Sequence, residues 1–176
     1  PTPEQLSLAN GFKAELLHVV PKGEQGSWVA LTEDHKGRLI ASDQYGHLYR
    51  ITPPKIGDDA SKIYIEKIDV PIGHAQGLLW AFNSLYVVVN GGGIAGHGSG
   101  LYRVIDTNGD DTLDKVETVK KINGGGEHGP HDIMLPPDKK NLLVVAGTHT
   151  NPPGAPADQP HPTHAEADPA ARSPPS

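Results

Sequence analysis

One segment of the chain has acidic side chains at the spacing of a calcium-binding loop. In the twelve residues from Asp106 to Glu117, oxygen-bearing side chains fall at positions 1, 3, 5, 9 and 12, and position 7 offers a backbone carbonyl. Calcium takes about six to eight oxygen ligands, which a loop of this length supplies at these positions. Position 6, usually glycine, is Asp111, a residue type that tolerates a left-handed backbone better than most. The predicted ligands are Asp106, Asn108, Asp110, Thr112, Asp114 and Glu117.

On both sides of this segment, apolar and polar residues alternate as they do in β-strands. A calcium ion would therefore lie in a β-hairpin, and the loop would not be an EF-hand. Asn108-Gly109 is also a frequent turn sequence. A plain turn with solvated acidic side chains is the alternative interpretation.

A second group of reactive side chains lies in the glycine-rich segment 124–132. It holds His128, His131 and Asp132 beside Glu127, just before a predicted strand. A neutral imidazole can act as a general base near neutral pH, and glycines allow a ligand to approach the backbone. A catalytic zinc site needs three protein ligands, of which the two histidines supply two. A purely structural loop is an equally good interpretation of these residues.

Two further histidines, His74 and His149, lie in loops at similar places relative to the predicted strands. In a propeller such loops gather at one face, so both side chains could line a pocket with His128; otherwise they are ordinary loop residues. The segment 90–100 has the glycine spacing of a dinucleotide-binding turn. That turn must open a helix whose N-terminus holds the pyrophosphate, whereas a strand-like sequence follows here. We therefore reject a nucleotide site.

The elements that would position these residues are repeated β-hairpins. Residues 28–42, 77–89 and 132–146 each show a short apolar strand, a polar turn and a second apolar strand. Another strand follows the first two hairpins, and its Leu48-Tyr49-Arg50 is repeated as Leu101-Tyr102-Arg103, 53 positions later.

A fourth candidate strand opens each unit, at residues 14–20, 63–70 and 115–122. Four strands at a spacing of about 50 residues predict a β-propeller blade, with a sandwich or another antiparallel meander as the alternative. Residues 1–150 hold about three blades, and closed propellers usually have about four to eight. We therefore expect an all-β, partial propeller-like array that belongs to a longer propeller or pairs with a second chain.

The composition bounds the rest of the chain. Residues 151–176 contain eight prolines and six alanines and no large apolar residue, which predicts a disordered tail. A formal net charge of −6 without a basic cluster argues against nucleic-acid binding. The absence of cysteine excludes disulfides, cysteine-bound metals and a thiol nucleophile. No apolar run approaches the ~18 residues of a transmembrane helix, and no signal peptide is expected in this chain.

The histidine loop at 127–131, the Pro137-Asp138 turn and the strand that follows to residue 147 resemble the soluble quinoprotein glucose and sorbosone dehydrogenase family. The segment 106–110, coming after the strand at 100–103, is most similar to its branch of sorbosone and membrane-bound dehydrogenases. The resemblance implies a propeller of about six blades. It also implies that pyrroloquinoline quinone (PQQ) and calcium serve in the oxidation of a sugar or aldehyde, usually in the periplasm.

The resemblance also implies roles for single residues. His128 falls at the family's general base, which removes the substrate hydroxyl proton while hydride passes to PQQ. His131 and Asp132 would orient that base or contact substrate, and His74 and His149 would contact the cofactor. Asp132 departs from the family pattern, because related enzymes carry an arginine four residues after the base.

Two rival hypotheses stay open. The chain could be a calcium-stabilised propeller module that binds a partner without catalysis, or a truncated inactive product. A zinc hydrolase built on His128 and His131 is the other rival. For the dehydrogenase hypothesis the expected partners are a small sugar or aldehyde, an electron acceptor that the sequence does not identify, and the missing blades or a second chain. A periplasmic or secreted location follows from the resemblance alone.

Overall fold

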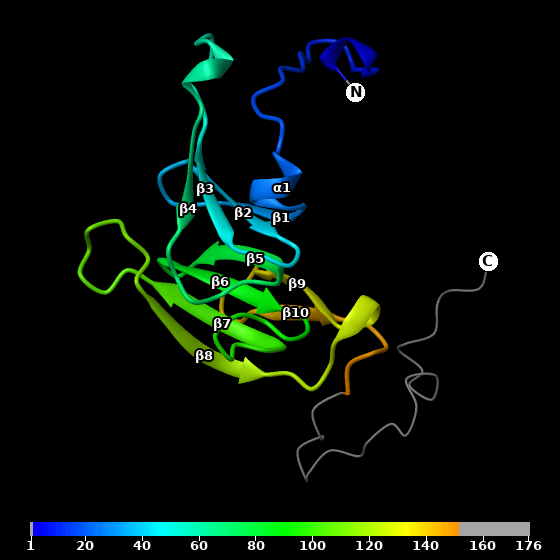
Figure 1. The fold of residues 1–176 in the computed structure, drawn as a ribbon, viewed down its shortest axis with the longest axis vertical. Coiled ribbons are helices and arrows are strands. Elements are labelled where there is room, and N and C mark those ends of the chain that lie inside the picture. The colour runs from blue at the N-terminus through cyan, green and yellow to red at the C-terminus, as the bar shows by residue number, and fades with distance from the viewer. Residues whose placement is uncertain (1, 152–176) are drawn as a thin grey trace, which may run out of the picture.

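A computed structural model describes residues 2–151, which form three antiparallel sheets of four, four and two strands (Figure 1). Strands account for 40% and helices for 9%, which confirms the all-β prediction. The predicted tail lies almost entirely outside the described residues.

The first two sheets are simple meanders in which each strand pairs with the next one along the chain. The first sheet contains β1 (Trp28–Glu33), β2 (Leu39–Asp43), β3 (Leu48–Thr52) and β4 (Tyr64–Ile68). The second contains β5 (Ala75–Ala81), β6 (Ser84–Val89), β7 (Gly100–Ile105) and β8 (Lys115–Lys121). The third consists of β9 (Pro130–Met134) and β10 (Leu143–Ala146).

All three predicted hairpins are confirmed, but the fourth strand is not where we expected it. β4 pairs with β3, and β8 pairs with β7, so each closes the unit before it instead of opening the next one. Residues 14–20 form no strand, although their sequence predicts one. In Figure 1 this N-terminal segment runs away from the sheets. A strand needs a pairing partner as well as a suitable sequence, and none of the described strands pairs with this segment.

The sheets pack face to face in the manner of propeller blades. One buried cluster, which includes Leu48, Val87 and Tyr102, lies between the first and second sheets. A second cluster, which includes Leu101 and Ile133, lies between the second and third. The repeated leucine therefore faces the next sheet in each unit, as expected if the units are structural repeats.

Strands β1, β5 and β9 are neighbours where the three sheets meet. Gly77 in β5 allows this approach, because a Cβ there would lie 2.8 Å from the Cα of Asp132 in β9. The hydroxyl of Ser42 donates to the carbonyl of Ala75 over 2.9 Å and joins the first two sheets.

In the described part of the chain, helix is confined to short turns. They are η1 (Pro3–Gln5), α1 (Lys22–Gln25), η2 (Ala60–Lys62) and η3 (Gly126–His128). Within the described range, no helix has the length and apolar character needed to span a bilayer.

Candidate functional site

A polar pocket with a volume of about 530 Å³ lies at the ends of the strands where the three sheets meet. The loop between β2 and β3, the link into β5, the loop after β6 and the loop before β9 all contribute to its wall. In a propeller these four loops belong to one face. The lining residues are Gln44, Tyr45, His74, Gln76, Asn90, Gly91, Gly92, Gly126, Glu127 and His131.

Asn90 holds three of these loops together. Its backbone N–H donates to the carbonyl of His74 over 3.2 Å, and its side-chain amide donates to the carbonyl of Gly126 over 2.7 Å. The amide oxygen of Asn90 packs against Gly129, where a Cβ would lie only 2.3 Å away. Glycine at 129 is therefore required for this loop to close on Asn90.

His74 is placed by an unusual backbone conformation. Its φ of 55° is left-handed, and its N–H donates to the carbonyl of Gly46 over 3.1 Å. The imidazole meets the ring of Tyr45 edge to face, with 6.0 Å between the ring centres. These contacts hold the side chain against the β2–β3 loop.

His131 reaches the pocket from the second position of strand β9. Its Nδ1 lies 2.7 Å from the carbonyl oxygen of Gly129. Because a carbonyl oxygen only accepts, Nδ1 is the donor of this contact, and the tautomer that fits it has its lone pair on Nε2. Asp132, the next residue, is exposed, and its carboxylate accepts from the N–H of Ile133.

The remaining two histidines of the predicted site lie elsewhere. His128 and His149 pack edge to face with 4.9 Å between ring centres, and the N–H of His149 donates to the carbonyl of His128 over 3.0 Å. Neither lines the polar pocket. The structure thus brings His74 together with His131, and His128 together with His149, whereas the sequence grouped His74, His128 and His149.

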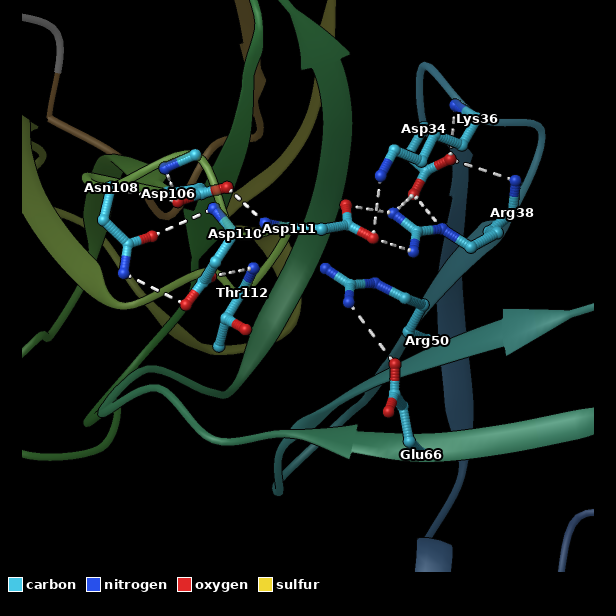
Figure 2. A network of polar contacts seen from close by, with 11 residues as sticks. Asp34, Lys36, Arg38, Arg50, Glu66, Asp106, Asn108, Asp110, Asp111 and Thr112 are labelled. Carbon is cyan, nitrogen blue, oxygen red and sulfur yellow. Dashed lines mark hydrogen bonds and ion pairs between the residues drawn. The ribbon is translucent and has the colours of Figure 1, made fainter.

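The acidic segment forms the loop between β7 and β8, as the hairpin interpretation expects. The carboxylate of Asp106 accepts from the N–H groups of Asn108, Gly109 and Asp111 at 3.2, 2.7 and 2.7 Å. Asn108 accepts from the N–H of Asp110, and Asp110 accepts from that of Thr112 (Figure 2). Asp111 has a φ of 74°, so the sixth position takes the left-handed conformation for which glycine is usual.

The last two predicted ligands are engaged in other contacts. Asp114 accepts from the N–H and the hydroxyl of Thr107 at 3.1 and 2.7 Å. Glu117 lies within β8 and pairs with Lys115 at 2.8 Å. No group of three or more histidine, aspartate or glutamate side chains in residues 2–151 has the arrangement of a metal site. Asp106, Asn108 and Asp110 thus share one turn, whereas Asp114 and Glu117 are directed to other partners.

Sequence reasoning missed an ion-pair network beside this loop. Arg38 binds Asp34 at 2.7 Å and Asp111 at 2.6 Å, and Lys36 binds Asp111 at 3.0 Å (Figure 2). Hydrogen bonds from Arg38 hold the pKa of Asp111 well below its usual value of 3.8 and raise that of Arg38. Burial raises the pKa of Asp34, but bonds from Arg38 outweigh it and lower the pKa overall. The one sequence feature that could have pointed to this network is Asp111, which stands at the sixth loop position, where glycine is usual.

Sequence reasoning also missed Gln44, Tyr45, Gln76 and Asn90 in the polar pocket. Gln44 and Tyr45 lie between two strands of the first unit, so their loop position could have drawn attention to them. No family model, curated protein or solved structure matches this chain.

Proposed function

We propose that the polar pocket binds a small polyhydroxylated molecule of the sugar class, and that the chain serves in its oxidation by a hydride acceptor bound outside this pocket, as the resemblance to sugar dehydrogenases implies. The lining supports the first part, because amide, phenol and imidazole groups all exchange hydrogen bonds with hydroxyl groups. The volume of about 530 Å³ falls within the range of about 300–1,000 Å³ typical of small-molecule sites.

The orientation of His131 carries the proposal. With Nδ1–H donated to Gly129, Nε2 is the nitrogen that can accept the proton of a substrate hydroxyl. We therefore assign the general base to His131 instead of His128. His74, held against Tyr45 in the lining of the same pocket, would orient the substrate. Glu127 supplies an acceptor for a second hydroxyl group.

The same lining does not fit PQQ. The quinone carries three carboxylate groups, which need cationic side chains when they are taken out of water. Among the described residues that line the pocket there is no lysine or arginine, and Glu127 adds a negative charge. His149, the second predicted cofactor contact, lies outside the pocket. We therefore assign to these residues only substrate binding and the hydroxyl proton, and we derive no step through the quinone.

The test is a titration of the folded chain with a panel of aldoses, in which binding is monitored through the NMR chemical shifts of the histidine rings. We expect saturable binding that His131→Gln weakens by about tenfold, the loss expected for one hydrogen bond. His128→Gln is the matched control, since it alters the same loop outside the pocket. An equal loss in both variants, or no saturable binding by a folded chain, would remove the pocket from the proposal.

A calcium-stabilised interaction module is the second candidate. The supporting observation is the β7–β8 loop, in which Asp106, Asn108 and Asp110 lie on one turn with a left-handed residue at its sixth position. A calcium ion would take the oxygens of these three side chains and the carbonyl of Thr112 in place of their internal contacts. A chain that binds calcium and no sugar would support this candidate. The periplasmic or secreted location stays a prediction.

A further inference from the structure

A second cavity, with a volume of about 300 Å³, lies at the other end of the first two sheets. Strand β2 runs between the two sites, from the β1–β2 turn at this cavity to the β2–β3 loop at the polar pocket. The polar, charged and aromatic side chains that line this cavity are His35, Lys36, Arg50, Trp80, Asn83, Asp106 and Asp111. Neither the sugar-binding proposal nor the calcium loop uses Arg50 or Trp80.

Arg50 and Arg103 occupy the same position in the two complete sheets. Each ends a Leu-Tyr-Arg sequence and lies opposite a glutamate on the next strand, Glu66 for Arg50 and Glu117 for Arg103. The ion-pair distances are 3.3 Å to Glu66 and 3.6 Å to Glu117. The two arginines are therefore an internal comparison within one chain.

The comparison shows that Arg50 lacks one partner. Nε of Arg103 donates to the hydroxyl of Ser84 over 2.9 Å. The side chain of Arg50 is only 10% exposed, and its buried Nε has no hydrogen-bond partner. The strand registers place Arg38 where the second sheet has Ser84, and Arg38 is already bound to Asp34 and Asp111.

The acidic groups around the cavity are already compensated. Asp111 binds Arg38 and Lys36, and Asp106 accepts from three backbone N–H groups. Arg50 contacts Glu66 through Nη1 alone. Nη2 makes no hydrogen bond to any described residue and, unlike Nε, is not buried, so it can donate to a carboxylate in the cavity. A small shift of the side chain would expose Nε beside it, and the two parallel donors then match the two oxygens of a carboxylate.

We propose that this cavity binds a small planar carboxylate, which accepts hydrogen bonds from the Nε–Nη2 edge of Arg50. His35 and Trp80 supply the apolar wall, because their rings stack with 5.0 Å between centres and an interplanar angle of 21°. The ring of the ligand packs against this pair while its carboxylate meets Arg50. The lining thus selects a molecule with one flat apolar part and one acidic group.

Benzoate is a suitable probe, and Trp80 is a suitable reporter. The chain has two tryptophans, so a Trp28→Phe background leaves Trp80 as the sole source of indole fluorescence. We expect a saturable change of this fluorescence with benzoate and a weaker response to acetate, which lacks the ring. In the same background, Arg50→Gln should weaken benzoate binding by about tenfold or more, and Arg103→Gln by less than about twofold.

A measurement on the chain with both arginines intact guards against loss of folding in the variants. Titration with benzoate should shift the Nε–H resonance of Arg50 in the NMR spectrum and leave that of Arg103 in place. A folded chain that gives no saturable response, or an equal loss in the two arginine variants, would overturn the proposal. Because this cavity is separate from the sugar pocket, either proposal can fail without the other.

Discussion

The guanidinium of Arg38 binds both carboxylate oxygens of Asp111, which lies 73 positions later in the chain. Nη1 and Nη2 donate to the two oxygens at 2.6 and 2.8 Å (Figure 2). Arg38 follows the turn between β1 and β2, and Asp111 lies in the loop between β7 and β8. The pair therefore joins the first sheet to the second at the same end of the array as the smaller cavity.

Removing one side of this pair should destabilise the chain. Asp111→Asn leaves Arg38 largely buried with fewer partners, and we expect a loss of roughly 2 kcal/mol in the free energy of unfolding. Denaturant unfolding of Asp111→Asn, Arg38→Gln and the double variant measures the coupling between the two groups. As a control, Glu15→Gln removes the exposed pair between Lys13 and Glu15, and it should have no measurable effect. Additive losses from the two single variants would contradict the coupling.

Stability should fall in acid because of the same carboxylate. The pKa of Asp111 is lower in the folded chain than its usual value of 3.8, because Arg38 donates hydrogen bonds to it. The unfolded chain therefore binds the proton first, and the stabilisation present above pH 3.8 is lost as the pH falls through the lower folded pKa. Unfolding of Asp111→Asn should depend less steeply on pH below 3.8. The pH dependence of stability that remains in this variant comes in part from Asp34, whose pKa Arg38 also lowers.

The left-handed backbone at position 111 gives a prediction that separates conformation from charge. Both Asp111→Gly and Asp111→Ala remove the ion pair, but only alanine must place a Cβ in a residue with a φ of 74°. Glycine should therefore be the more stable of the two by about 1 kcal/mol. Comparing their unfolding midpoints at neutral pH is sufficient. Equal stabilities would mean that the loop changes its backbone when the ion pair is lost.

Calcium should stabilise the chain if the β7–β8 loop binds it. We expect the melting temperature to rise with added calcium more than with magnesium, and to return when the ion is chelated. Asp110→Asn should weaken this response, because Asp110 lies in the turn with Asp106 and Asn108. Glu117→Gln should leave it intact, since Glu117 is paired with Lys115 in β8. A response lost only in Glu117→Gln would mean that the loop rearranges to recruit this residue.

The hairpins could be predicted because their signals are local. Alternating apolar residues and short polar turns specify two paired strands, and the repeated Leu-Tyr-Arg sequence places a third beside them. The fourth strands at Tyr64–Ile68 and Lys115–Lys121 were also recognised, but not the unit to which each belongs. That assignment depends on which neighbour supplies the hydrogen bonds, and strand patterning does not encode the neighbour.

The sequence by itself determined that the chain is all-β, that it repeats, and that its acidic segment is a hairpin loop. These properties follow from residue types and spacings within about a dozen positions. Only the tertiary structure decided that His131 and His74 line one pocket, that His128 packs against His149, and that Arg38 reaches Asp111. Each of these relationships involves different loops, so it depends on how strands pair and sheets pack. The presence of a histidine or an arginine in the sequence does not show which residue it will contact in the folded chain.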